Sequence, residues 1–479
     1  MSTQSTADAD LEPQGPLARA AQALARFTEK WFPDAFVFAA FGTVLVAVLA
    51  LANGGNPVTL VATFGDGFWD LAAFTLQMAM VVLTGYVVAT SPPVLRIIEA
   101  LARVPKGPRS AVAFVALIAL LVSLLNWGLS LITGGLLARA VARRKDLQVD
   151  YRALGAAALM GLGAVWALGL SSSAAQLQAT PKSIPAAVLS ITGVLDFGKT
   201  IFTWQSMLSA LILILVTVAI AYASAPRGKA VRTAEQMEVD VTDTVEEPEP
   251  RTRPAEWFEY NPILSIGVGI LTLGWVVYQF ATKPVVQVLS NLNGYLMVFL
   301  VLGLVLHGTP RRFLMAVNKA VPATAGILVQ FPLYAAMAAM LTKVPGYGGH
   351  TVSDRLATIF TSFGGGSGFA VVLAIYTAVL GLLVPSGGGK WLVEAPYVMQ
   401  AANDLQYNLG WTVQIYNMAE ALPNLINPFF MLPLLAILKV RARDLVGFTF
   451  LQFIFHLPVV LLLVWLLGTT FSYIPPIIP

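Results

Sequence analysis

The strongest constraint on the fold is a polar break inside an apolar run whose two ends are both basic. The break runs from Ser123 to Ser130, and its centre reads Asn126, Trp127, Gly128. The basic residues before the run are Arg96, Arg103, Lys106 and Arg109, and those after it are Arg139, Arg143, Arg144, Lys145 and Arg152. Because Lys and Arg collect in cytoplasmic loops, both ends are expected inside the cell. Residues 110–142 therefore predict a re-entrant hairpin that opens inward, and its tip near mid-membrane must be buried in protein or line a polar cavity.

Composition indicates a membrane protein with many crossings. Hydrophobic residues make up 57% of the 479 positions and charged residues 11%, whereas soluble proteins carry about 25% charged residues. The net charge of +4 comes mainly from loop arginines, so it indicates topology and no nucleic-acid partner. The absence of cysteine excludes disulfides and thiol chemistry, and His307, His350 and His456 lack the spacing of metal ligands. We expect no cofactor.

Nine membrane-spanning helices are expected from apolar runs of about 20 residues. They lie at 34–53, 68–90, 153–175, 203–224, 262–281, 293–309, 320–342, 411–438 and 444–468. Basic loops follow the second, fourth, sixth and eighth spans, which predicts an inside N-terminus and an outside C-terminus in the bacterial cytoplasmic membrane. Residues 1–33 show no cleavable signal peptide, and they form a cytoplasmic tail that ends in an interfacial amphipathic helix or simply frays.

The acidic segment 226–258 divides the chain into two halves. It contains Glu246-Glu247-Pro248-Glu249-Pro250, and we expect a disordered cytoplasmic linker. The first half covers 34–225. A connecting transmembrane helix at 259–292 precedes the second half at 293–479.

A second hairpin is expected at 364–407, opening outward. Its first arm, from Phe369 to Val384, has about 16 residues and reaches roughly 24 Å, too short for a hydrocarbon core of about 30 Å. Pro385 and the glycines that follow it force a break. Since the next basic cluster begins only at Lys439, both ends of this hairpin are expected outside.

Each half continues with a span that is broken by polar residues. Gly169 to Ser173 ends the third span, and Pro423 to Pro428 interrupts the eighth. Two halves of like plan and opposite orientation, with broken helices at mid-membrane, are typical of secondary transporters. The similar sequences Thr90-Ser91-Pro92 and Thr309-Pro310 favour a parallel repeat instead, but they are short. We therefore predict an all-α polytopic fold with an inverted repeat.

The hairpin tips are the candidate binding site, because helix N-termini present unpaired N–H groups that suit a carboxylate. The candidates are Asn126, Trp127, Gly128, Ser171, Ser172, Ser173, Ser386, Gly387, Gly388, Gly389, Lys390, Asn424 and Asn427. The alternative is that these small and polar residues only hold helices together. Trp127 and Trp391 either line the space for an apolar tail or pack.

Three ionisable residues fall in the deep segments. A buried carboxylate costs at least about 2.5 kcal/mol, so Glu420 is a candidate for carrying a coupling proton or holding sodium near the tips. Lys390 either pairs with a substrate carboxylate or extends toward the interface. Glu394 lies beside the second tip.

The run from Val384 to Pro396, which reads VPSGGGKWLVEAP, resembles the signature of the bacterial short-chain fatty acid transporters. Asn126-Trp127-Gly128, and Glu420 with Asn424 to Phe429, are similar to the same family. That family often has Asp at position 420 and Gln at position 427, changes that keep the acid and the amide. The resemblance covers nearly the whole chain after the N-terminal tail.

The resemblance implies uptake of short monocarboxylates such as butyrate and acetoacetate. The family is grouped with the ion transporter superfamily, which implies an elevator mechanism and a homodimeric scaffold. The moving unit would hold both hairpins and the third, fourth, eighth and ninth spans. The residues alone indicate only a carrier of a small anion with H+ or Na+. A carrier of dicarboxylates or of an amino-acyl conjugate, or a channel, stays an alternative. An enzyme is not indicated, since there is no Ser-His pair, HExxH motif or Asp dyad.

Overall fold

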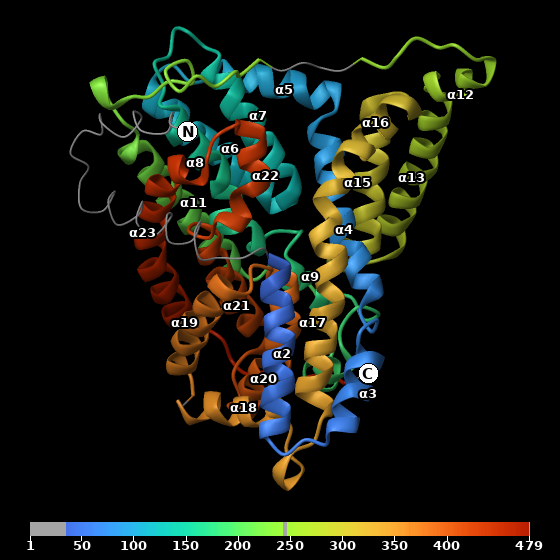
Figure 1. The fold of residues 1–479 in the computed structure, drawn as a ribbon, viewed down its shortest axis with the longest axis vertical. Coiled ribbons are helices and arrows are strands. Elements are labelled where there is room, and N and C mark those ends of the chain that lie inside the picture. Colours follow the sequence, from blue (N-terminus) through green and yellow to red (C-terminus); the bar gives the residue numbers. More distant parts are fainter. Residues whose placement is uncertain (1–34, 243–246, 364, 479) are drawn as a thin grey trace, which may run out of the picture.

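The computed structural model describes residues 35–242, 247–363 and 365–478, and within these ranges the chain is helical without strands (Figure 1). The predicted all-α fold is confirmed. The predicted cytoplasmic tail and interfacial helix at 1–33 lie outside the described residues. At the end of the molecule that carries α5 (Pro92–Ala102) and α16 (Pro310–Ala320), basic residues are frequent, while α18 (Val352–Ser362) lies at the opposite end.

Each of the nine predicted spans corresponds to a helix or a broken helix. In chain order these are α2 (Ala35–Ala52), α4 (Ala72–Ala89), the broken helix from α8 (Tyr151–Met160) to α9 (Ser173–Ala179), α11 (Trp204–Ser224), α13 (Ile263–Thr282), α15 (Leu292–His307), α17 (Ala325–Lys343), the pair α21 (Leu409–Asn424) and α22 (Pro428–Leu438), and α23 (Ala442–Gly468). By length and apolarity alone, 7 helices of the described residues could cross a membrane, or up to 8 if the bent pair is one span. That count includes an arm of the first hairpin and leaves out the shorter α2 and α15.

Segments outside the predicted spans and hairpins contain further helices. These are α3 (Pro57–Gly67), α5, α10 (Ala186–Thr192), α14 (Val285–Leu289), α16 and α18. Asn56 and Thr309 cap α3 and α16 through side-chain oxygens, and α3, α5 and α16 have proline in the first turn. Proline suits that position because its missing N–H would have no helical partner. Ser91-Pro92 and Thr309-Pro310 are therefore helix starts, which accounts for their similarity without a parallel repeat.

The first hairpin consists of α6 (Pro108–Leu125) and α7 (Trp127–Ala142), joined at Asn126. Asn126 has extended backbone dihedrals, so the chain turns there instead of continuing the helix. The two arms lie directly against each other, and the Ser130 hydroxyl donates to the Ala119 carbonyl across them at 2.7 Å.

The second hairpin consists of α19 (Ser367–Leu383) and α20 (Gly387–Asp404), with Val384 to Ser386 between them. Side chains join its arms: the Thr377 hydroxyl donates to Glu394 at 2.7 Å, and the hydroxyls of Tyr376 and Tyr397 lie 2.7 Å apart. In Figure 1, α6 and α7 lie in the upper half of the molecule and α19 and α20 in the lower half.

Both predicted broken spans are broken. After α8 the chain forms a π-helical turn at Gly161–Val165 and a 3-10 turn at Trp166–Leu168. The break therefore begins eight residues before Gly169, and Ser171 to Ser173 lie inside the broken span and not at its end. The α21–α22 pair bends by 53°.

Helix packing in one half recurs in the other. The first arm α6 contacts α8 and α11, and the first arm α19 contacts their counterparts α21 and α23. The second arms α7 and α20 lie against α4 and α17, respectively. This correspondence is consistent with the predicted repeat, whose exact symmetry stays a prediction.

The described parts of the linker are mostly irregular but are bound to the helices. Arg139 of α7 donates to the backbone carbonyl of Thr242 at 2.9 Å, and Arg143, which follows the last residue of α7, donates to that of Val241 at 3.0 Å. The Asp150 carboxylate accepts from the Arg232 amide at 2.9 Å. Residues 232–242 are thus hydrogen-bonded to the end of α7 and to Asp150, whereas the expectation of a disordered linker stays a prediction.

Candidate functional site

The first tip is built around the side chain of Asn126, which is fully buried. Its Oδ1 accepts from the Leu129 amide at 2.9 Å and caps α7, while its Nδ2 donates to the Val81 carbonyl of α4 at 3.4 Å. The Ser171 hydroxyl accepts from the Trp127 amide at 2.9 Å. The hydroxyl of Tyr295 on α15 donates to the last carbonyl of α6, Leu125, at 3.0 Å. Asn126 thus holds the shape of the tip.

The second tip uses the same capping device. The Ser386 hydroxyl accepts from the Gly389 amide at 3.1 Å and caps α20. A Cβ at Gly387 would lie 2.6 Å from the Trp166 ring, and one at Gly389 would lie 2.2 Å from the Tyr334 ring. The glycines are therefore required for close approach of the backbone to its aromatic neighbours.

The two tips are linked through the broken third span. The Trp127 and Trp166 rings meet edge to face with centroids 6.2 Å apart, and Trp166 also touches Gly387. Ser171 binds the first tip, and the Ser173 Cβ lies 3.2 Å from where a Cβ of Gly388 would sit. The predicted tips and the Ser171–Ser173 segment thus come together in one buried place.

Unpaired hydrogen-bond donors gather at this place. The first N–H groups of a helix have no partner within it. In α7 those of Trp127 and Leu129 are bound by side chains, and in α20 that of Gly389 is. Within the described part of the chain, the N–H groups of Gly128, Gly387 and Gly388 have no hydrogen-bond acceptor, so they remain available to a ligand. The indole nitrogens of Trp127 and Trp166 are buried and also have no hydrogen-bond partner among the described residues.

The remaining predicted residues lie around this centre with different contacts. Ser172 caps α9 and donates to Asn417 at 3.2 Å. Asn424 donates to the Leu162 carbonyl at 3.0 Å, and its buried Oδ1 has no hydrogen-bond partner among the described residues. Asn427 caps α22 and donates to Leu382 at the end of α19. Asn427 therefore contributes mainly to the bend between α21 and α22, and less to the hairpin tips.

A buried charge cluster lies behind the second tip. Lys390, Glu394 and Glu420 are all 0% exposed. The Lys390 ammonium forms an ion pair with Glu420, donates to the Thr377 carbonyl at 2.7 Å, and lies 3.9 Å from Glu394. A Cβ at Gly387 would sit 3.3 Å from Glu420 Oε1, so the cluster adjoins the tip backbone. The expectation that Lys390 might extend to the interface is wrong, because two acids and a carbonyl hold it in the interior.

Several site residues were not predicted from the sequence. Trp166, Tyr295, Tyr334 and Thr377 all belong to segments predicted as plain helix. Only the spacing of Glu394 four residues after Lys390 offered a local signal of the cluster. Trp391 is fully buried with its ring 4.5 Å from that of Tyr416, which favours the packing interpretation.

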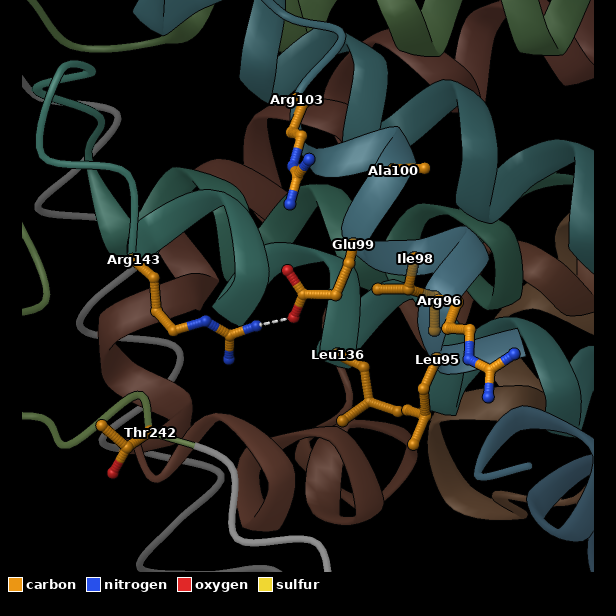
Figure 2. Close-up of a pocket in the computed structure, with 9 residues that line it drawn as sticks. All are labelled: Leu95, Arg96, Ile98, Glu99, Ala100, Arg103, Leu136, Arg143 and Thr242. Carbon is orange, nitrogen blue, oxygen red and sulfur yellow. Dashed lines mark hydrogen bonds and ion pairs between the residues drawn. The ribbon is translucent and has the colours of Figure 1, made fainter. Parts of the chain in front are cut away.

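A separate cavity of about 680 Å³ opens at the basic end, between α5 and α7 (Figure 2). Arg96, Arg103 and Arg143 line it, and Arg143 forms an ion pair with Glu99. In Figure 2 the dashed line joins the Arg143 guanidinium to the Glu99 carboxylate of α5. The cavity lies away from the tips and contains none of the predicted site residues.

The fold and the site define a class of protein. Two helical hairpins whose tips adjoin broken helices inside an apolar bundle are the architecture of a secondary transporter. Two solved structures share the fold. The Alcanivorax borkumensis YdaH transporter matches with a TM-score of 0.57 at 16% identity, covering 91% of this chain and 98% of that one. Neisseria gonorrhoeae MtrF, whose description concerns a class of antimetabolite efflux pumps, matches with a TM-score of 0.58 at 15% identity, covering 96% and 98%.

Sequence comparison narrows the class. Residues 16–467 match the family described as short chain fatty acid transporter. Proteins of Escherichia coli (strain K12) and Haemophilus influenzae (strain ATCC 51907 / DSM 11121 / KW20 / Rd) are 32% and 30% identical over 92% of this chain, covering 97% and 98% of their own lengths. Both carry provisional names as short-chain fatty acid transporters. The chain belongs to the short-chain fatty acid transporter family, and it is a multi-pass membrane transport protein, a class that is not enzymatic.

Proposed function

We propose that this protein carries short-chain monocarboxylate anions across the bacterial cytoplasmic membrane by alternating access, with the carboxylate bound between the two hairpin tips. The observation that carries the proposal is the convergence of the α7 and α20 N-termini on Trp166. Each brings unpaired backbone N–H groups, from Gly128 on one side and Gly387 and Gly388 on the other. The positive ends of helix dipoles in an apolar interior favour a negative charge.

The surroundings of the tips suit a short apolar tail. Trp127 and Trp166 form one wall, and Phe331 lies 3.2 Å from a Cβ built at Gly388. Neither tip carries an arginine in its sequence. A second carboxylate would need such a partner, since an unpaired charge at this depth is costly. The site therefore favours monocarboxylates over dicarboxylates.

The packing supports an elevator movement. The hairpins, α8, α11, α21, α22 and α23 contact one another and would form the transport unit. The scaffold would consist of α2, α4, α13, α15 and α17, and it meets that unit chiefly where α4 lies against α7 and α17 against α20. We propose that the scaffold forms a homodimer, with the N-terminus inside and the C-terminus outside. The buried cluster that contains Glu420 would take up the coupling ion, H+ or Na+.

Counterflow in proteoliposomes tests the site. Vesicles loaded with unlabelled butyrate should accumulate labelled butyrate through the wild-type protein, whereas loading with succinate should not drive that uptake. Because butyric acid crosses lipid unaided, protein-free vesicles supply the background. Equal exchange with succinate would favour a dicarboxylate carrier, and single-channel currents under voltage would favour a channel.

A matched pair of glycine variants locates the binding place. Gly388→Leu puts a side chain against Phe331 and Ser173, and we expect it to abolish counterflow while expression stays normal. Gly274→Leu is the control, because a Cβ at Gly274 on α13 meets nothing within 4 Å. Normal counterflow in Gly388→Leu would refute the placement of the substrate at the tips.

A further inference from the structure

Glu394 differs from Glu420, the other buried acid, in having no direct contact with a cation, although both acids have an oxygen without a hydrogen-bond partner among the described residues. Its Oε2 accepts from the Thr377 hydroxyl at 2.7 Å. Its Oε1 has no hydrogen-bond partner among the described residues, and the Lys390 ammonium is 3.9 Å away, beyond hydrogen-bonding distance. An ionised carboxylate with a bare oxygen in a dry interior is strongly disfavoured. Protonation of that oxygen removes the charge.

The balance of charge around Glu394 requires one proton. Lys390 supplies one positive charge, and Glu394 and Glu420 supply two negative charges when both are ionised. The other ionisable neighbours are tyrosines 334, 376, 397 and 416, whose hydroxyls are neutral at physiological pH. On α18, Asp354 and Arg355 hydrogen-bond near the start of that helix, to Thr351 and Tyr347, and stay outside the cluster. A net charge of minus one is thus left in a fully buried site until a proton binds.

The geometry distinguishes the two acids. Glu420 is in direct contact with the Lys390 ammonium, which stabilises its ionised form. The other close partner of that ammonium is the Thr377 carbonyl. Glu394 receives only one hydroxyl donor and a more distant cation. The proton therefore resides on Glu394, while Lys390 and Glu420 remain a fixed ion pair.

A sodium ion does not suit the same place. Sodium would have to be surrounded by oxygen ligands, and here the Lys390 ammonium already occupies the space between the two carboxylates. Within the described ranges, no group of three or more His, Cys, Asp or Glu residues is arranged to hold a metal ion.

We infer that Glu394 is the proton-carrying residue, that it binds one H+ for each monocarboxylate, and that transport is electrically neutral. This inference rests on the proposed function. The proton enters from the water on one side, forms the O–H bond at Oε1 of Glu394, and leaves to the water on the other side. One negative substrate and one proton move together, so the net charge moved is zero.

Currents on solid-supported membranes test this directly, because passive diffusion of neutral butyric acid carries no charge. Wild-type proteoliposomes should show counterflow of labelled butyrate but no current when butyrate is added, with or without a sodium gradient. In Glu394→Gln the substrate moves without its proton, so butyrate should evoke a current of negative charge moving with the substrate. Glu394→Asp restores the carboxyl group, so butyrate should again evoke no current.

The outcomes separate the inference from the proposed function. A wild-type current on addition of butyrate, a requirement for sodium, or an electrically silent Glu394→Gln variant that still performs counterflow would each overturn the inference. Absence of butyrate counterflow in the wild type would instead overturn the proposed function.

Thr377→Val tests the inference even if the Glu394→Gln variant does not fold. It removes the hydroxyl that stabilises ionised Glu394, so protonation becomes easier. The pH at which counterflow falls to half should move upward. An unmoved midpoint in a folded Thr377→Val variant would overturn the assignment of the proton to Glu394.

Discussion

The two hairpins differ in what lies between their arms. In the first, α6 and α7 pack directly, and a hydroxyl-to-carbonyl bond from Ser130 to Ala119 joins them. In the second, the polar side chains of Thr377, Lys390 and Glu394 fill the space between α19 and α20. Both tips use the same cap and present the same backbone donors. In the proposed mechanism, the tips alone would recognise the anion, whereas the response to protons would need the buried acids, which lie in the second hairpin and in α21.

The largest expected effect falls on the charged hairpin. Lys390→Met leaves two buried acids without their cation, and removing one member of a buried pair costs about 3–5 kcal/mol. We expect a large loss of thermal stability, measured on purified protein in detergent. The control is Lys343→Met, whose pair with Asp70 is about half exposed and should contribute only about 0–1 kcal/mol.

A double variant keeps that comparison informative if the single variant does not fold. Lys390→Met combined with Glu420→Gln removes the ion pair as a unit and leaves one acid, which can protonate. Stability should recover in large part. If the double variant is no more stable than Lys390→Met, the ion pair does not hold the hairpin together.

A smaller effect is expected from crowding the first hairpin. A Cβ at Gly169 would lie 2.3 Å from the Leu124 carbonyl oxygen and 2.4 Å from the Leu124 Cα, both backbone atoms that cannot rotate away. Gly169→Ala should cost about 1–3 kcal/mol and weaken the 2.7 Å bond from the Leu170 amide to Leu124. Gly267→Ala on α13, where a Cβ has open space, is the control. Equal melting temperatures of Gly169→Ala and Gly267→Ala would show that the first hairpin tolerates separation from the broken third span.

The smallest stability changes should come from the caps, which sharpen the comparison because both hairpins have one. Asn126→Ala and Ser386→Ala should each cost about 1 kcal/mol. Transport should suffer more in Asn126→Ala, since Asn126 also binds the Val81 carbonyl on α4. We expect it to lose uptake with normal expression, whereas Asn126→Asp keeps the capping oxygen and part of the activity. Equal counterflow in the two alanine variants would show that the α4 contact is dispensable.

The local sequence was sufficient to predict the parts of the fold that the thickness of the lipid bilayer determines. A helix needs about 20 apolar residues to cross, so run length and basic loops predicted the helices and both breaks. The same reasoning passed over α3, α5 and α16, because amphipathic helices lack a long apolar run. Their signal was a capping residue followed by proline, as in Asn56-Pro57.

The contacts of the site were harder to predict because they join distant segments. The spacing of Lys390 and Glu394 was visible in the sequence, but Glu420 comes from α21 and Thr377 from α19. Trp166 gives no local sign of linking the tips, since it sits in an ordinary apolar stretch that becomes a 3-10 turn. The identity of a buried residue's partners depends on packing, which a single sequence does not contain.

The helices α5 and α18 have a mechanical consequence. Each has 11 residues, and each joins a scaffold helix to the first arm of a hairpin, at opposite ends of the molecule (Figure 1). A helix of that length is a stiff rod of about 16 Å. In the proposed elevator movement, rods of equal length on the two faces would let both hairpins shift by similar distances, so that the two tips stay together.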